Sequence, residues 1–535
     1  MISFLKNIFI LMMVTCLFSP QTVFAHASLI KASPAPGTHL DKSPNQVILT
    51  FNERLENELF YIKVLNQNGK SVTANTAIMD QQQSEIRLSL PELQDGLYTV
   101  SYKVISADGH PISESYVFMV GKNVASNHQI DDPSHHHQHE VSSQIGLMQV
   151  ITYISRIIYF LALLLLVGWT FWGMLIRFRS QEQQTHYRLW SLNLQRLFML
   201  SILFMIILHL PDYLDPFAFR DFASLLFGTS IGISWVSSLS LALISFVILN
   251  RSKWVDFAWI ILLLTAKSLS GHAMAFEPAF RTVALDIIHL FAASIWVGGL
   301  FYMLVHWRKY KEAASDLLPK FSNYALVSMM ILTISGVLST LIYLPRLKYI
   351  LYTQWGLFLI AKCMLVILVI VTGAVLRYLM KRKRQNLGRL LKVDFILMLL
   401  IVMIVSIFTY LNPQPVNQPL YWHVMGKTVH MTTKITPNAP GNNTFLVTVW
   451  MPEESGKPKA VQLIFKYQDD KDVAPIVVPL DEASVDESPN FLEFKPYNFQ
   501  TEGPYLPFAG RWMAEVRVMD ANDNETVYQK EMMIY

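Results

Sequence analysis

The pattern of hydrophobic and polar positions divides the chain into three stretches. Residues 26–122 contain short runs in which apolar and β-branched residues alternate with polar ones, such as "QVILTFNERL" and "GLYTVSYKVIS". Turn sequences such as "NQNGK" and "ADGHP" separate these runs. Short alternating runs separated by turns are typical of a small antiparallel sandwich or barrel. Residues 420–535 show the same period, so we predict a second β-sandwich there.

The middle stretch, residues 146–412, holds apolar runs close to the length that spans a bilayer. We count eight of them, at 146–176, 194–210, 224–249, 254–270, 283–305, 323–345, 355–379 and 393–411. Basic residues follow the odd-numbered runs, for example Arg177, Arg251, Lys309 and Lys381. Because basic loops stay in the cytoplasm, both ends of the mature chain are expected outside the cell. Arg346 and Lys348, after the sixth run, depart from this pattern.

The predicted fold class is therefore a multidomain membrane protein, with an eight-helix transmembrane bundle between two all-β domains. Composition agrees, since 52% of residues are hydrophobic and 15% are charged, against about 25% charged in soluble proteins. The apolar runs predict a protein of the plasma membrane. Because the net charge of +4 is small, we expect no nucleic-acid binding. Cys16 and Cys363 are the two cysteines, which leaves His, Asp, Glu and Met as metal ligands.

Residues 1–25 have the pattern of a secretory signal peptide, with an apolar run, "IFILMMVTCLF", and a small residue, Ala25, at the cleavage position. Cleavage after Ala25 would make His26 the first mature residue. The sequence "AHA" also allows cleavage after Ala27, which would remove His26, and local rules leave both sites open. Residues 123–145 form a polar linker with four clustered histidines, which either bind metal weakly or are simply solvated.

An N-terminal His26 could bind a metal ion through its α-amino nitrogen and its imidazole together. Asp108 and His110, in "SADGHPIS", are two positions apart and point to the same face of an extended segment. Two imidazoles, an amine and a carboxylate make a tetragonal N,O ligand set, which suits Cu(II). The alternative interpretation is a solvated histidine and an ordinary Asp-Gly turn.

Ionisable residues in or beside the apolar runs are costly in lipid and are therefore functional candidates. They are Arg156, His209, Lys267, His272, Asp286, His289, Lys362, Arg377 and Asp394. Asp286 and His289 are at i and i+3 and share one helix face, and together with His272 they form a candidate copper path. Met274 and Met303 add soft donors that suit Cu(I). Alternatively, these histidines are polar anchors whose hydrogen bonds are satisfied.

The segments "HASLIKASPAPGTHL", "VILTFNERL" and "YTVSYKVISADGHPISESYVFMVG" resemble a CopC copper-binding domain over its full length. The resemblance implies that His26, Asp108 and His110 are Cu(II) ligands and that cleavage follows Ala25. The predicted domain contains only Met79 and Met119, so we expect no separate Cu(I) site of the Met-rich kind within it.

The segments "SGHA", "DIIHLFAASIWVGGL" and "FSNYALVSMMILTISGVLST" are similar to the CopD membrane family, over most of 145–412. This resemblance implies copper binding by His272 and His289. The glycines Gly298–Gly299 in the same segment have a structural interpretation, since they permit close helix packing. The tail segment "GPYLPFAGRWMAEVRVMD" resembles a YtkA-type β-sandwich. The order CopC–CopD–YtkA resembles the fused YcnJ copper-acquisition proteins.

We therefore predict copper import, with Cu(II) capture outside the cell and passage through the bundle, in part as Cu(I). The expected partners are the copper ion, the lipid bilayer and an extracytoplasmic copper donor or reductase. No nucleotide-binding or phosphorylation motif is visible, so ATP is not expected to drive transport. We expect no enzymatic activity. The alternatives are copper resistance, sequestration or sensing without net import, an oxidative polysaccharide enzyme with a histidine brace, and a haem-b electron carrier that uses His209, His272 and His289.

Overall fold

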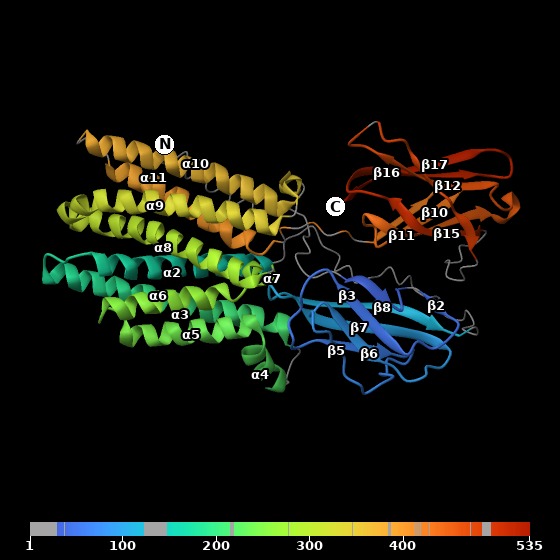
Figure 1. Ribbon diagram of the computed structural model, residues 1–535, viewed down its shortest axis with the longest axis horizontal. Helices are drawn as coiled ribbons and strands as arrows, with labels where there is room; N and C mark the ends of the chain where they lie inside the picture. Colours follow the sequence, from blue (N-terminus) through green and yellow to red (C-terminus); the bar gives the residue numbers. More distant parts are fainter. Residues whose placement is uncertain are drawn as a thin grey trace.

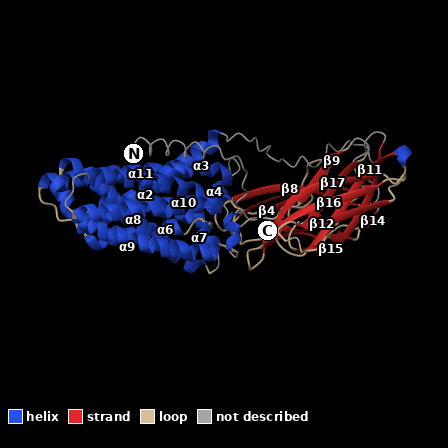
Figure 2. Cartoon of the chain, turned by 90° about the horizontal axis from the view of Figure 1, so that it is seen from above, coloured by secondary structure: helices blue, strands red, loops and turns tan. Residues whose placement is uncertain are grey.

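The computed structural model describes three segments of the chain. It covers residues 29–121, 147–411 and 413–535, apart from 37, 215–218, 277, 345, 352, 383–386, 414, 416, 418, 427–428, 471 and 484–493. The predicted signal peptide, His26 and the linker 123–145, with His135, His136, His137 and His139, lie outside the described residues. Two β domains lie at the same end of an elongated helical bundle (Figures 1 and 2).

The N-terminal domain is the predicted β-sandwich. One sheet has the order β1 (Leu29–Ser33), β3 (Gln46–Phe51), β6 (Glu85–Ser89) and β5 (Ile78–Met79). The other has the order β2 (His39–Leu40), β8 (Pro111–Val120), β7 (Gly96–Ile105) and β4 (Tyr61–Leu65). Alternate residues such as Val47, Leu49 and Phe51 are buried, because successive side chains of a strand point to opposite faces. The alternation in the sequence therefore positions the core between the two sheets.

Seven helices in the described part of the chain are long and apolar enough to cross a membrane. They are α2 (Leu147–Leu175), α3 (Gln181–Tyr213), α5 (Ser230–Ile248), α8 (Ala279–Lys309), α9 (Lys311–Tyr343), α10 (Gln354–Lys381) and α11 (Leu387–Phe408). The remaining predicted span, 254–270, is α6 (Lys253–Ser268), which has 16 residues and packs against α5 and α8. At about 1.5 Å per residue, α6 is shorter than a hydrocarbon core of about 30 Å.

Two helix boundaries differ from those predicted from hydrophobicity. The apolar run 224–249 is divided into α4 (Phe219–Gly228) and α5, because Thr229 caps α5 by accepting a hydrogen bond from the Gly232 amide at 3.1 Å. The run 194–210 is only the apolar part of α3, which begins after Ser180, its N-cap. Polar caps determine where a helix starts, so an apolar run alone underestimates α3.

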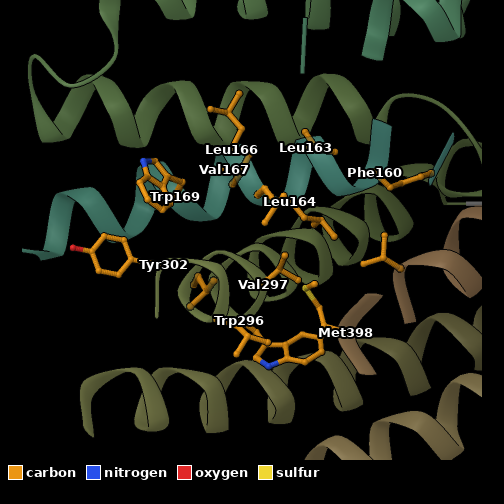
Figure 3. Close-up of a cluster of buried hydrophobic side chains, with 14 of the residues drawn as sticks. Phe160, Leu163, Leu164, Leu166, Val167, Trp169, Trp296, Val297, Tyr302 and Met398 are labelled. Carbon is orange, nitrogen blue, oxygen red and sulfur yellow. The ribbon is translucent and has the colours of Figure 1, made fainter. Parts of the chain in front are cut away.

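The core of the bundle lies between α2, α8 and α11, where Leu163 and Val297 are buried beside Met398 (Figure 3). Helices α2 and α8 cross at Gly168 and Gly298. A Cβ atom added to Gly298 would lie 2.4 Å from the Gly168 Cα. This backbone contact excludes any side chain, so Gly298 permits close helix packing.

The C-terminal domain is the second predicted β-sandwich. Its first sheet has the order β14 (Asp481–Ala483), β15 (Phe494–Leu506), β11 (Gly441–Pro452), β10 (His430–Thr436) and β9 (Leu420–Met425). The second has the order β13 (Ile476–Val478), β12 (Ala460–Tyr467), β16 (Gly510–Met519) and β17 (Glu525–Ile534). Phe445, Phe465 and Trp512 are fully buried in its core.

Glu515 on β16 is a buried carboxylate with three hydrogen-bond donors around it. Lys466 Nζ donates to it at 2.6 Å, Arg517 Nε at 2.7 Å and Gln529 Nε2 at 2.7 Å. Burial by itself would raise the pKa of Glu515, but these hydrogen bonds outweigh burial and lower the pKa from 4.5 to about 2. The charged form of Glu515 therefore stabilises the C-terminal domain.

Candidate metal centre

The N-terminal domain is docked on the end of the helix bundle through the region around the β7–β8 turn. Ile105 packs in a small apolar cluster with Tyr213 and Trp235 of the bundle. Lys103 Nζ donates a hydrogen bond to the Tyr213 carbonyl oxygen at 2.9 Å, and the Tyr213 hydroxyl donates to the carbonyl oxygen of Gly109. The turn is therefore held against the end of α3.

Two further contacts fix the same domain on neighbouring parts of the bundle. Arg54 donates a hydrogen bond to the Met274 carbonyl oxygen, in α7 (His272–Ala275), at 3.1 Å. Glu56 accepts hydrogen bonds from the Ser230 amide, at 3.3 Å, and from the Ser230 hydroxyl at the start of α5. Contacts with α3, α5 and α7 together determine which bundle residues face the turn.

The backbone conformation of the β7–β8 turn favours glycine at position 109. Gly109 has a φ of 91°, a conformation that L-residues with a Cβ atom adopt only with strain. A Cβ atom at this position would lie 3.0 Å from Ile231 Cδ1 in α5. The Ser106 amide donates to the His110 carbonyl oxygen at 2.9 Å, and the Ser106 hydroxyl donates to Asp108. These bonds hold the Asp108 carboxylate in one orientation.

Asp108 lies between two imidazoles that come from different parts of the molecule. Its Oδ2 atom is 3.8 Å from His110 Nε2, in the same turn, and 3.6 Å from His272 Nδ1, in the bundle. All three side chains are at most 13% exposed. The two donor atoms of either pair are close enough to share one ion bonded at about 2 Å from each. The structure thus brings the predicted residues Asp108 and His110 together with His272, which the sequence suggested as part of the membrane path.

The hydrogen bond made by His272 identifies which of its nitrogens can bind a metal. Nε2 lies 2.8 Å from the Leu411 carbonyl oxygen, which can only accept, so Nε2 carries the proton. The lone pair is then on Nδ1, the atom that faces Asp108. Burial lowers the pKa of His272, although the Asp108 charge opposes this effect. A neutral imidazole oriented by a hydrogen bond to a carbonyl is the usual form of a metal-ligating histidine.

A pocket of about 310 Å³ adjoins this group on the side of α3. It is lined by His110, Pro111, Ser113, His209, Asp212, Tyr213 and Tyr410. His209 Nδ1 is 2.8 Å from the Met205 carbonyl oxygen, and its Nε2 is buried without a hydrogen-bond partner among the described residues. His209 is therefore a further donor beside the site.

Glu53 is a buried carboxylic acid that sequence reasoning missed. Its Oε1 atom has no hydrogen-bond partner in the described part of the chain. Burial, with a smaller contribution from the Asp108 charge, raises the pKa of Glu53 from 4.5 to about 8. Glu53 is thus a neutral acid at pH 7. The residue follows β3 in the segment "FNERL", and nothing in that segment distinguishes it from a solvated turn residue.

Burial also lowers the pKa of His110, and the charge of Arg156 lowers it further. Arg156 on α2 donates to the Ser406 carbonyl oxygen and to Thr409 Oγ1, both at 3.1 Å. Its guanidinium lies 5.1 Å from the centre of the Tyr410 ring, which packs against the His110 ring at 81°. Arg156 therefore places a fixed positive charge close to the site.

The other predicted membrane residues engage different neighbours. Asp286 accepts a hydrogen bond from Ser268 of α6 at 2.7 Å, whereas His289 Nδ1 is 2.9 Å from Ser335 Oγ of α9. Although Asp286 and His289 share a face of α8, each contacts a different helix. Both remain predicted path residues.

The described donors form two pairs that share Asp108, namely Asp108 with His110 and Asp108 with His272. No set of three His, Cys, Asp or Glu side chains in the described ranges is placed to hold one ion. The predicted ligand His26 lies outside those ranges. A complete Cu(II) site at this turn therefore remains a prediction that depends on His26.

Comparison with known proteins matches two separate parts of the chain to copper proteins. The model of the CopC domain matches residues 29–121, and the model of copper resistance protein D matches residues 315–408, which include α9, α10 and α11. The copper transport protein CutJ of Bacillus subtilis (strain 168) is 28% identical over an alignment of 490 residues, which covers 85% of this chain and 87% of CutJ.

Two shorter relatives cover the N-terminal domain. Protein YobA of Escherichia coli (strain K12) is 34% identical over 109 residues, which are 20% of this chain and 86% of YobA. The crystal structure of CopC from Methylosinus trichosporium OB3b is 34% identical and covers 18% of this chain and 99% of that chain, with a TM-score of 0.18.

Proposed function

Because the chain belongs to the CopC family and joins its CopC domain to a copper resistance protein D domain in one multi-pass membrane protein, we propose that it imports copper across the plasma membrane. The N-terminal domain captures Cu(II) outside the cell with His26, Asp108 and His110. The ion then passes to His272 and enters the bundle. The name of the relative CutJ, a copper transport protein, supports transport as the activity.

The observation that carries this proposal is the position of the Asp108 carboxylate between His110 and His272. An ion held by Asp108 and His110 can exchange His110 for His272 while Asp108 stays bound to it. Ligand exchange of this kind moves the ion from the domain to the bundle without releasing it into water. The shared carboxylate neutralises part of the ionic charge throughout the exchange, which lowers its electrostatic cost in a buried position.

The orientation of the site in the membrane is supported by the distribution of charge at the two ends of the bundle. Both β domains lie at one end (Figure 1), and basic residues such as Arg179, Lys253 and Lys309 occur at the other. Basic ends face the cytoplasm, so the site at Asp108 faces the outside. An extracytoplasmic reductase would supply one electron to convert Cu(II) to Cu(I). Asp286 and His289 would serve the later part of the path.

Copper resistance without net import is the second candidate, and the name of the matching membrane domain supports it. Copper accumulation distinguishes the two. Cells that lack the gene are compared with cells that express the wild type or Asp108→Asn, and total cell copper is measured by mass spectrometry. Import predicts more copper with the wild type and background copper with Asp108→Asn. The matched control is Asp41→Asn, the same change at an exposed position of the same domain, which should accumulate wild-type copper.

Less copper in wild-type cells than in cells without the gene would reject import in favour of resistance. Equal copper with the wild type and Asp108→Asn would reject the assigned site. A Soret band in the purified protein would instead support the haem-b carrier.

A further inference from the structure

Two histidines meet at the end of the bundle opposite to the N-terminal domain. His186 is near the start of α3, and His306 is near the end of α8. Their ring centres are 5.2 Å apart and the rings are nearly perpendicular, at 87°. Two imidazoles that share an ion at about 2 Å from each nitrogen have ring centres on the order of 5–6 Å apart. The spacing therefore fits a common ion.

Each of these rings has a buried nitrogen without a hydrogen-bond partner among the described residues, Nδ1 in His186 and Nε2 in His306. His306 Nδ1 is 3.1 Å from the Tyr302 carbonyl oxygen, which only accepts, so Nδ1 carries the proton and Nε2 has the lone pair. Buried polar atoms are nearly always paired in folded proteins. The two unpaired nitrogens, on rings whose centres are 5.2 Å apart, are therefore candidate ligands for one ion.

Aromatic packing fixes the His306 ring. It stacks on Tyr302 with ring centres 3.9 Å apart and lies 5.9 Å from Trp169, two residues shown in Figure 3. His306 is fully buried, so it cannot turn its free nitrogen to water. His186 is only half-buried, and near it an ion pair of 2.9 Å joins Lys309 to Glu182, both more than half exposed. The pair of rings thus connects the buried core with the solvent at this end.

We propose that His186 and His306 form a two-imidazole copper site at the inner end of the bundle. Imidazole is a good ligand for copper, and two neutral rings leave the bound ion with its full charge, which favours later release toward water. The inference rests on the proposed function, since it assigns this site as the position from which imported copper leaves. Nothing in the proposed capture at Asp108 requires it.

Copper binding by the purified full-length protein tests the site. The Asp108→Asn background disables the outer site, and Cu(I) is titrated in competition with a chromogenic Cu(I) chelator. X-ray absorption then identifies the ligands of any bound ion. We expect about one Cu(I) bound by two imidazole nitrogens. His306→Phe keeps the stacking on Tyr302 but removes the donor atoms, and His186→Asn changes a half-buried position, so both variants should fold.

Each of the two variants should weaken Cu(I) binding at least about tenfold in this background. The matched control, His423→Phe in the C-terminal domain, should bind as the background does. The inference is wrong if the Asp108→Asn protein binds no Cu(I), or if its binding is unchanged by His306→Phe and His186→Asn. Wild-type copper uptake with no binding at this pair would reject the inner site alone. Binding at this pair, together with no copper accumulation in cells that express the wild type, would reject import but leave the inner site intact.

Discussion

Replacing Gly109 with alanine tests whether the β7–β8 turn is docked on the bundle as described. The φ of 91° makes a non-glycine residue there unfavourable by about 1–2 kcal/mol. The new Cβ would also lie 3.0 Å from Ile231 Cδ1, and relieving this contact adds about 1 kcal/mol, because the atom ends a flexible side chain. We therefore expect a total destabilisation of about 2–3 kcal/mol.

Gly69→Ala separates backbone strain from the contact with the bundle. Gly69 is in the same domain with a φ of 70°, but no atom lies within 4 Å of its added Cβ. It should cost about 1–2 kcal/mol and leave docking unchanged. In a double-mutant cycle, Ile231→Ala should make Gly109→Ala less harmful by about 1 kcal/mol.

The assay is hydrogen exchange of the full-length protein in detergent, followed in peptides from the turn and from the start of α5. A loss of about 1 kcal/mol in docking corresponds to roughly fivefold less protection at α5. We expect this loss in Gly109→Ala but not in Gly69→Ala. Equal exchange at α5 in both variants, with no effect of Ile231→Ala, would refute the docked arrangement.

Three further predictions concern other contacts. Tyr213→Phe removes the hydroxyl that donates to the turn and should weaken docking by about 1 kcal/mol, measured by the same exchange assay. Gly168→Ala places a Cβ 2.0 Å from the Ser294 carbonyl oxygen and should destabilise the bundle by at least about 3 kcal/mol, lowering its thermal midpoint. Gly373→Ala, inside α10 with open space around it, should not lower the midpoint, because alanine favours a helix over glycine. Because the pKa of Glu515 is lowered to about 2, its stabilisation should be complete above about pH 4.5 and fade as pH falls toward 2. Glu515→Gln should remove about 1–3 kcal/mol at neutral pH, measured by proteolytic unfolding of the C-terminal domain as a function of pH. An acid response of Glu515→Gln identical to that of the wild type would contradict this assignment.

Periodicity predicted most of the fold because it reports which side of each element is buried. The alternating run 46–51 became β3, and the long apolar runs became the bundle. The start of α3 was missed because the Ser180 cap and the polar first turns carry no hydropathy signal. The break at Thr229 was missed for the opposite reason, since the apolar character continues across it from α4 into α5.

The candidate site was only partly predictable. Spacing placed Asp108 and His110 on one face, but His272 joins them through domain docking, which no local pattern encodes. No local pattern pairs His186 with His306. Both histidines lie at ends of predicted spans that the basic loops place on the same side of the membrane. That position alone does not select His186 and His306 among the other residues at those ends, because only the packing of α3 against its neighbours brings the two rings together.

The handover from Asp108 to His272 is tested most directly by copper uptake in a His272→Gln protein whose Cu(II) binding has been measured. The account predicts that this protein still captures Cu(II) with close to wild-type affinity, because His26, Asp108 and His110 are intact, while uptake falls to the level of cells without the gene. Uptake at the wild-type rate in His272→Gln would contradict the account.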